Sequence, residues 1–275
     1  MASKTSEKWV LVGDKWTKIT VISSYDTNQL TVIFLGNPGN GKYYEQFSHC
    51  FLKYMKTLGV SKCGLDNEEI DHASVYIISY LNHVIMPDYL KSVDSHKQSD
   101  RFGLFDQVQH KVDFCKQYLL KNAKLILIGH SIGAYIMLRL AEELLSTGYA
   151  VVRAFGLFPT IERMKISPMG RRLYPLLTFL NSYDSWLAPI TSCIKWLPDS
   201  LKRVACKWHF TNPETPQCVF EATHEILDVD ILRNIIHLAV EELETVGWGI
   251  DIDNCEHAFV IESGEVVAKK LMEWL

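Results

Sequence analysis

Short apolar runs and amphipathic segments alternate along most of the chain. Four mostly apolar runs predict strands of a sheet: residues 30–35, 75–80, 125–128 and 151–158. The run at 125–128 is unbroken, as is typical of a strand that is buried on both faces. Apolar side chains recur at helical spacing in three stretches near these runs: residues 44–58, 105–119 and 135–145. Because strands and helices alternate, the pattern predicts an α/β fold with a mostly parallel sheet and helices on both of its faces.

Two further patterns lie on either side of this alternation. Near the N-terminus, residues 9–12 and 16–22 are separated by Gly13-Asp14-Lys15, which predicts a β-hairpin. The C-terminal part predicts, in order, a helical region, a final strand and a last helix: residues 221–246, 249–252 and 265–275. With 275 residues and 48% hydrophobic content, the chain can bury one large core, so we expect a single domain over residues 1–275.

Residues 160–219 break the alternation, because six prolines are spread among bulky apolar side chains. An insertion of this kind between core elements predicts a helical lid. The alternative is a helical subdomain that only covers the sheet. We expect the prolines at 175, 189 and 198 to interrupt any single helix, so that residues 173–197 form a bent hairpin lying in a lipid interface. The candidate lipid-docking residues are Leu176, Leu177, Phe179, Trp186 and Trp196.

Charge and cysteine usage narrow the function classes. The formal net charge of −4 argues against nucleic acid as a partner, because phosphate binding requires a clustered basic surface. The seven cysteines have no C-x-x-C spacing, so neither a disulfide framework nor a zinc site is indicated, and no metal or other cofactor is expected. No apolar run reaches the roughly 18 residues of a transmembrane helix, and the polar N-terminus does not resemble a signal peptide.

The most informative chemical motif is Gly129-His130-Ser131-Ile132-Gly133, which follows a buried strand and opens a helix. It matches G-x-S-x-G, the nucleophile elbow of α/β-hydrolases, in which a serine occupies a sharp strand-to-helix corner. We expect a side chain at position 129 or 133 to collide with the neighbouring strand or helix. Ser131 is therefore the candidate nucleophile, and the alternative is a serine that only caps the helix.

Residues 36–41 form a glycine-rich loop after the first buried strand. They are not a phosphate-binding P-loop, because Lys42 is followed by tyrosine and not by serine or threonine. In a hydrolase this loop supplies a backbone donor to the oxyanion hole. We expect the N–H groups of Asn37 and Ile132 to form that hole, since Pro38 has no N–H.

A general base is predicted from chain order. His257 lies between the last predicted strand and the last predicted helix, which is where the order serine, acid, histidine places the base. His83 lies in a loop, and we expect it to be solvated and not to line the pocket. No carboxylate near the end of the chain follows a convincing strand of its own, so the acid stays unassigned among Asp228, Asp230, Asp251 and Asp253.

Four motifs together resemble the lipid droplet-associated hydrolase family: residues 36–39, 129–133, 158–164 and 257–259. The Phe-Pro-Thr-Ile-Glu-Arg-Met run at 158–164 is the most specific of them. The resemblance implies an α/β-hydrolase fold and a serine esterase that acts on lipid esters, with sterol esters among the candidates, in cholesterol and neutral-lipid homeostasis. It also implies residence on lipid droplets and the cytosolic face of the endoplasmic reticulum.

The resemblance fails near the C-terminus, where family members carry a Gly-Thr-x-Asp-like segment before the last strand. Here Val246 runs almost directly into Gly247-Trp248-Gly249, so we expect a strand, its acid and the following helix to be missing. Loss of the acid in a serine protease lowers kcat by about 10⁴ without abolishing the reaction, which predicts weak activity. The alternative function is an inactive hydrolase-fold scaffold on the droplet surface.

Overall fold

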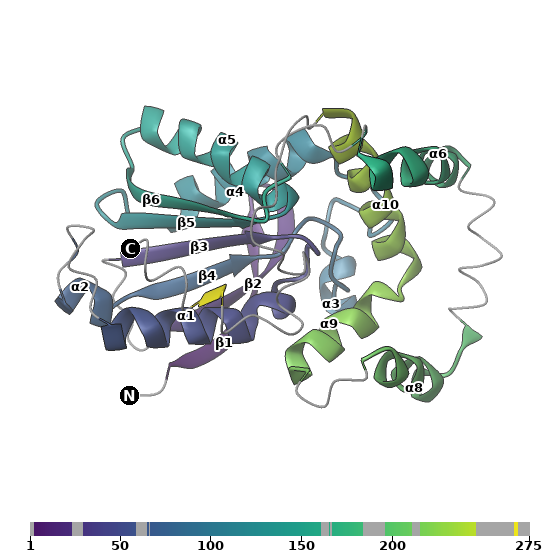
Figure 1. The fold of residues 1–275 in the computed structure, drawn as a ribbon, viewed down its shortest axis with the longest axis horizontal. Coiled ribbons are helices and arrows are strands. Elements are labelled where there is room, and N and C mark those ends of the chain that lie inside the picture. The colour runs from purple at the N-terminus through teal and green to yellow at the C-terminus, as the bar shows by residue number, and fades with distance from the viewer. Residues whose placement is uncertain are drawn as a thin grey trace.

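The structure, a computed structural model, describes residues 3–23, 30–58, 65, 67–160, 165, 167–183, 196–210, 215–245 and 267–268. Within this part a twisted sheet has the strand order β1-β2-β4-β3-β5-β6 (Figure 1). Its strands are β1 (Lys4–Val12), β2 (Lys15–Ser23), β3 (Leu30–Gly36), β4 (Ser74–Ile78), β5 (Lys124–His130) and β6 (Ala150–Leu157). The predicted hairpin is confirmed as the antiparallel pair β1–β2, and β4, β3, β5 and β6 run parallel, as the alternating pattern predicted.

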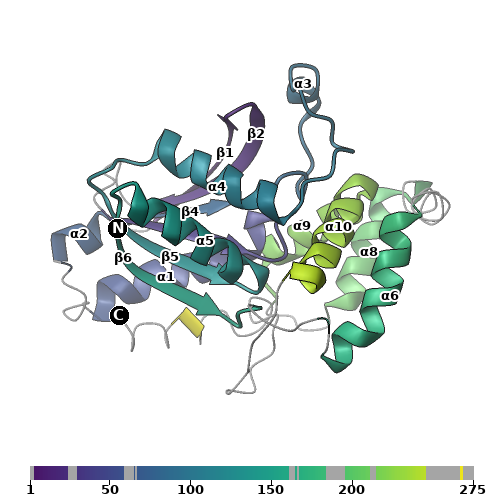
Figure 2. The ribbon, with the colours of Figure 1, turned by 90° about the horizontal axis from the view of Figure 1, so that it is seen from above.

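Helices cover both faces of the sheet. In chain order they are η1 (Gly41–Tyr44), α1 (Glu45–Leu58), α2 (Asn67–Asp71), α3 (Asp88–Lys91), α4 (Leu104–Tyr118), α5 (Ile132–Ser146), α6 (Pro168–Ser182), α8 (Asp199–His209), α9 (Gln217–Ile226) and α10 (Val229–Thr245). Figure 2 shows α4 and α5 on one face of the sheet and α1 on the other. Strand and helix positions therefore follow the hydrophobic pattern closely in the first 157 residues.

Two apolar clusters, one on each face, form the core. Alternate residues of the central strands enter opposite clusters: Phe34 and Ile128 pack on the α1 side, while Leu35 and Leu127 pack on the side of α4 and α5. Every residue of β3 is buried, which explains why its sequence is apolar except for Thr31. Side chains on both faces of the central strands are thus packed against helices. This packing holds the carboxyl ends of the strands in place, and with them the first residues of the loops that follow.

The helices after β6 lie beyond the carboxyl ends of the parallel strands in both ribbon views (Figures 1 and 2). Helix α6 packs on α10 and α8 packs on α9. Residues 221–246 were predicted to be helical, and the structure places α9 and α10 there through Thr245. The predicted strand at 249–252 lies outside the described residues, and of the predicted last helix only Val267 and Ala268 are described, both helical and buried.

The expectation that Pro175 would interrupt its helix is wrong, because α6 continues from Pro168 through Ser182 with Pro175 inside it. A proline inside a helix costs about 3 kcal/mol. Two features offset that cost: the Ser167 side chain accepts a 2.9 Å hydrogen bond from the Gly170 N–H at the first turn, and α6 packs on α10. Pro198 directly precedes α8, as its fixed φ permits, and residue 189 lies outside the described residues.

Among the residues that the structure describes, none of the helices combines the length and apolar character needed to cross a membrane.

Candidate active site

Ser131 occupies the corner between β5 and α5 in a conformation that is unusual for a residue with a side chain. Its φ and ψ angles are 57° and −127°, and holding a non-glycine residue in a sparsely populated region costs on the order of 1–3 kcal/mol. The Ser131 N–H donates to the Leu157 carbonyl at 3.0 Å, and the Thr160 N–H donates to the Ser131 carbonyl at 3.3 Å. These bonds from the end of β6 hold the corner in place.

The same geometry argues against a serine that merely caps the helix. An N-cap residue has extended backbone angles, and its side chain accepts a hydrogen bond from the first turn. Ser131 has a positive φ, and its side chain makes no capping hydrogen bond to α5. The corner therefore has the backbone geometry expected of a nucleophile elbow.

The two glycines of the motif have the steric role that the sequence predicted. A Cβ at Gly129 would lie 2.5 Å from the Cα of Ala134 in α5. A Cβ at Gly133 would lie 2.2 Å from the Leu35 carbonyl oxygen in β3. Either distance is far shorter than a van der Waals contact, so any side chain would push α5 away from the sheet and move Ser131.

The loop after β3 lies beside this corner. Gly36 is paired with His130 in the parallel register, so Asn37 and Ser131 follow neighbouring strand ends. The Tyr44 hydroxyl contacts the His130 Nδ1 at 2.9 Å, and the Tyr44 ring lies over Gly36, where no Cβ would fit. The register and Tyr44 thus place the Asn37 backbone next to the start of α5, where Ile132 lies.

The loop is also tied to the helices beyond the sheet. The Asn40 side-chain amide donates to the Glu225 carboxylate in α9 at 3.0 Å. Lys42 forms ion pairs with Glu221 at 3.0 Å and with Glu225 at 3.4 Å. Lys42 therefore anchors α9, which is a structural role and not the phosphate contact of a P-loop.

Thr160 and Glu242 are polar neighbours of Ser131 that the sequence reasoning missed. The Thr160 Oγ1 lies 3.2 Å from the Ser131 Oγ, and the Thr160 side chain is hydrogen-bonded to the Glu242 carboxyl group. Burial raises the pKa of Glu242 to about 7, although the Thr160 hydrogen bond opposes the rise. The helical period was the available signal, since it places position 242 on the buried stripe of α10 with Ile231 and Leu238.

The expectation that His83 is a solvated loop residue is wrong, because its side chain is only 1% exposed. The loop after β4 folds inward over the glycine-rich loop, and the missing side chain of Gly39 leaves room for the imidazole. Burial, with Lys111 nearby, lowers the pKa of His83 to about 3. Neither ring nitrogen has a hydrogen-bond partner in the described part of the chain, so this histidine is neutral at physiological pH.

The predicted base and two of the four candidate acids, His257, Asp251 and Asp253, lie outside the described residues. The other two acids have structural contacts. Asp228 Oδ1 accepts hydrogen bonds from two backbone N–H groups at the start of α10, and Asp230 pairs with Arg233 at 3.4 Å. Neither contact involves Ser131.

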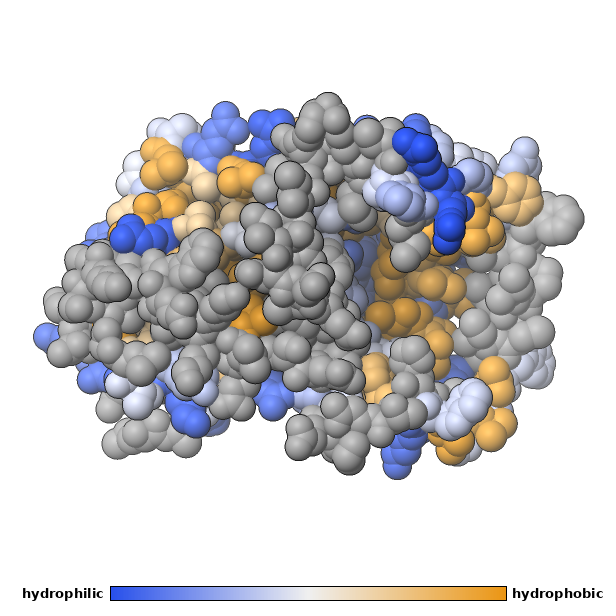
Figure 3. Space-filling view, viewed as in Figure 1, coloured by the Kyte–Doolittle hydropathy of each residue, from blue (hydrophilic) through white to orange (hydrophobic). Residues whose placement is uncertain are grey.

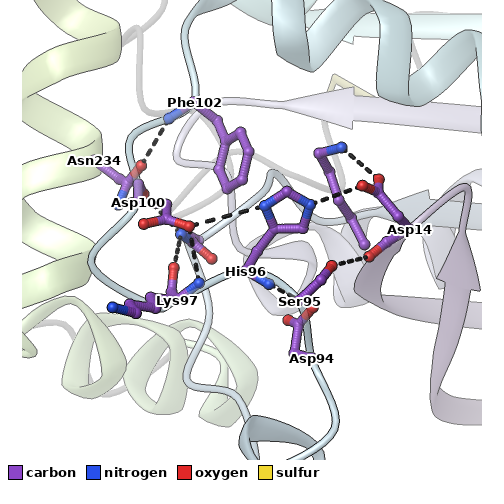
Figure 4. Close-up of polar contacts among 10 residues, drawn as sticks. Asp14, Asp94, Ser95, His96, Lys97, Asp100, Phe102 and Asn234 are labelled. Carbon is purple, nitrogen blue, oxygen red and sulfur yellow. Dashed lines mark hydrogen bonds and ion pairs between the residues drawn. The ribbon is translucent and has the colours of Figure 1, made fainter.

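A histidine–aspartate cluster is present elsewhere in the described structure (Figure 4). The His96 Nε2 lies 3.0 Å from Asp14, and its Nδ1 lies 3.8 Å from Asp100. Asp14 belongs to the β1–β2 turn, and three strands of the sheet, β2, β4 and β3, separate this hairpin edge from β5. The Asn234 amide donates to the Asp100 carbonyl at 3.1 Å, so this cluster ties the hairpin to α10 and is not a partner of Ser131.

The described ranges contain no group of three or more histidine, cysteine or carboxylate side chains arranged to hold a metal ion.

Comparison with known sequences identifies the family. Residues 27–258 match the family described as lipid-droplet associated hydrolase. The lipid droplet-associated hydrolase of Pongo abelii is 35% identical over 255 residues, which cover 88% of this chain and 70% of the relative. The lipid droplet-associated hydrolase of Gallus gallus is 32% identical over 221 residues, which cover 79% of this chain and 62% of the relative. The Homo sapiens protein is 35% identical over 183 residues, which cover 64% of this chain and 51% of the relative. The chain therefore spans about half to two thirds of the length of these relatives.

Solved structures show the same fold at low sequence identity. The ligand-free epoxide hydrolase CorEH superposes with a TM-score of 0.58 over 98% of both chains at 10% identity. A protein from Acinetobacter baumannii that has been provisionally named a lipase gives 0.51 over 88% of this chain and 66% of its own, at 13% identity. Such distant likenesses establish the α/β-hydrolase fold alone. With the family match over residues 27–258, the chain belongs to the lipid droplet-associated hydrolase family.

Proposed function

We propose that this protein is a serine hydrolase of lipid esters with Ser131 as its nucleophile. The observation that carries the proposal is the strained corner at Ser131, which is held by backbone bonds from the end of β6 and by the close packing of Gly129 and Gly133. Backbone strain of this kind persists where the surrounding structure enforces it, and it occurs preferentially at reactive sites. Membership of the lipid droplet-associated hydrolase family supports an ester in a lipid as the substrate class.

In the proposed reaction the Ser131 oxygen attacks the ester carbonyl while His257 takes the hydroxyl proton. The N–H groups of Ile132 and Asn37 stabilise the oxyanion, and Ile132 adds the positive end of the α5 dipole. The alcohol leaves with the proton from His257, and water then hydrolyses the acyl-enzyme by the same steps. Sterol esters are among the proposed substrates, and the unassigned acid predicts a slow enzyme.

We also propose that α6 and α8 dock the protein on the phospholipid monolayer of a lipid droplet or on the cytosolic face of the endoplasmic reticulum. Each helix exposes an apolar stripe to solvent: Leu173, Leu176 and Phe179 on α6, and Leu201, Val204 and Trp208 on α8. Trp196 is 86% exposed. Figure 3 shows hydrophobic residues on the side of the molecule that these helices form. Contiguous exposed apolar surface indicates a binding surface.

The other candidate docking residues have different positions. Leu177 is half-buried, so the exposed stripe of α6 does not depend on it, and Trp186 lies outside the described residues. Arg171 and Arg172 are exposed at the start of α6, and near an anionic surface each adds about 1 kcal/mol of attraction. An exposed apolar surface also fits the second candidate function, a droplet-surface scaffold without catalysis, because docking alone does not require a reactive serine.

The two functions are separated by an assay of the purified protein on emulsified triolein and cholesteryl oleate. We expect slow release of oleate by the wild type, and loss of that release in Ser131→Ala. Ser146→Ala is the matched control, because Ser146 lies exposed at the end of the same helix and bonds only to a backbone carbonyl. Equal oleate release by Ser131→Ala and wild type would refute the nucleophile, and no release by any form, with intact droplet binding, would favour the scaffold.

A further inference from the structure

A buried line of three polar side chains connects the candidate nucleophile to α10. The Ser131 Oγ lies 3.2 Å from the Thr160 Oγ1, and the Thr160 side chain is hydrogen-bonded to the Glu242 carboxyl group. Their exposed fractions are 2%, 6% and 6%. The three residues come from the β5–α5 corner, the segment after β6 and the second half of α10, so distant parts of the chain meet here.

The carboxyl group of Glu242 lacks the partner that a buried carboxyl normally has. Buried acids are usually paired with a cation or a metal, because an isolated buried charge is costly. Among the described residues no lysine, arginine or histidine forms an ion pair with Glu242. The Thr160 side chain is hydrogen-bonded to it, and the nearby Tyr80 hydroxyl, whose pKa is raised by burial and by the charge of Glu242, has no hydrogen-bond partner in the described part of the chain. The buried Glu242 carboxyl group is thus hydrogen-bonded to Thr160, and Thr160 is the residue whose hydroxyl contacts Ser131.

We propose that Thr160 and Glu242 hold the Ser131 hydroxyl in one orientation, with Glu242 as a positioning residue that acts through Thr160. This inference rests on the proposed role of Ser131 as nucleophile. A threonine hydroxyl has one hydrogen to donate and lone pairs that accept. A protonated Glu242 carboxyl donates to the Thr160 oxygen, and the Thr160 hydrogen then points at a lone pair of the Ser131 oxygen. That bond fixes the rotamer of the Ser131 oxygen and leaves the Ser131 hydrogen available to His257.

The arrangement acts on the nucleophile and not on the substrate. Thr160 and Glu242 are buried, and Thr160 is additionally fixed by the bond from its N–H to the Ser131 carbonyl. A loosened nucleophile spends less time in the attacking geometry, and misplacement by about 1 Å costs up to about 10²-fold in rate. Loss of the orientation should therefore lower kcat and leave KM nearly unchanged.

Two matched pairs of variants of the full chain test the proposal, with hydrolysis of a soluble p-nitrophenyl ester as the assay. Thr160→Val keeps the shape and removes the hydroxyl, whereas Thr160→Ser keeps the hydroxyl. Glu242→Met keeps the length and removes the hydrogen bond to Thr160, whereas Glu242→Gln keeps a group that can donate to Thr160. We expect Thr160→Val and Glu242→Met to lower kcat about tenfold with KM within about twofold, and the serine and glutamine variants to keep about a third or more of wild-type kcat.

Circular dichroism and thermal unfolding report whether each variant folds. The Glu242 pair decides the question if Thr160→Val does not fold, because a buried carboxyl can be replaced by an apolar residue of similar volume without loss of stability. An unchanged kcat in the folded Thr160→Val or Glu242→Met, equal losses within either pair, or a loss confined to KM would overturn the proposal. Full activity of Ser131→Ala would instead overturn the proposed function on which it rests.

Discussion

The ionisation of Glu242 predicts how stability changes with pH. Burial raises the pKa of this carboxyl from 4.5 to about 7 in the folded chain. Between these two values the unfolded chain has released the proton and the folded chain still holds it, so unfolding becomes more favourable as pH rises. The contribution is greatest below pH 4.5 and is lost by about pH 7. At 1.36 kcal/mol per unit, the 2.5-unit difference amounts to about 3 kcal/mol.

Glu242→Gln removes this ionisation and keeps the size of the side chain. At pH 4.5 both chains carry a neutral group at position 242, so their free energies of unfolding should agree within about 1 kcal/mol. As pH rises to 7, the wild type loses stability that the variant keeps. The variant should therefore become the more stable protein by about 3 kcal/mol, and the difference should stay constant at higher pH.

Urea unfolding followed by tryptophan fluorescence, repeated at pH 4.5, 6 and 7.5, measures that difference. Only the difference in the free energy of unfolding between the wild type and Glu242→Gln is informative, because the ionisation of His83 changes stability with pH in the opposite direction. Its pKa, lowered from 6.5 to about 3, makes the wild type and the variant alike gain stability as pH rises through that range. A difference that does not change with pH would refute the reasoning, since it would mean that Glu242 titrates alike in the folded and unfolded chains.

Two other substitutions test the packing of the corner and the docking surface. Gly133→Ala should lower the free energy of unfolding by about 1–3 kcal/mol in urea titrations, because its methyl group would meet a β3 carbonyl; wild-type stability would contradict the close approach. Leu176→Asp should weaken co-flotation with phospholipid-coated triolein droplets about tenfold or more, since burying a leucine is worth about 1.5–3 kcal/mol. Leu145→Asp, an exposed leucine of α5, is its control, and equal effects of the two would contradict docking through α6.

The sequence predicted those parts of the fold in which local pattern and burial agree. Residues 30–35 are apolar except for Thr31, and residues 125–128 are entirely apolar, because their strands lie at the centre of the sheet, with α1 on one face and α4 and α5 on the other. The corner at Ser131 was predictable because its two glycines are required by close contacts that any side chain would break. In both cases the residues that mark the feature lie within a single stretch of sequence.

The remaining features depend on tertiary contacts that no local pattern contains. Pro175 is tolerated inside α6 because another helix packs on it, and His83 is buried because a loop from another part of the chain lacks a side chain at Gly39. Thr160 and Glu242 are far apart in sequence and each is ordinary by itself. Their connection to Ser131 became visible only when the end of β6 and α10 were placed beside the corner.

The central claim, that Ser131 is an activated nucleophile, is tested most directly by a fluorophosphonate probe and mass spectrometry of the labelled protein. The account predicts one phosphonate adduct on the peptide that contains Ser131, its loss in Ser131→Ala, and its retention in the exposed control Ser146→Ala. The folded wild type staying unlabelled under conditions that label a known serine esterase, or an adduct on another residue, would contradict the account.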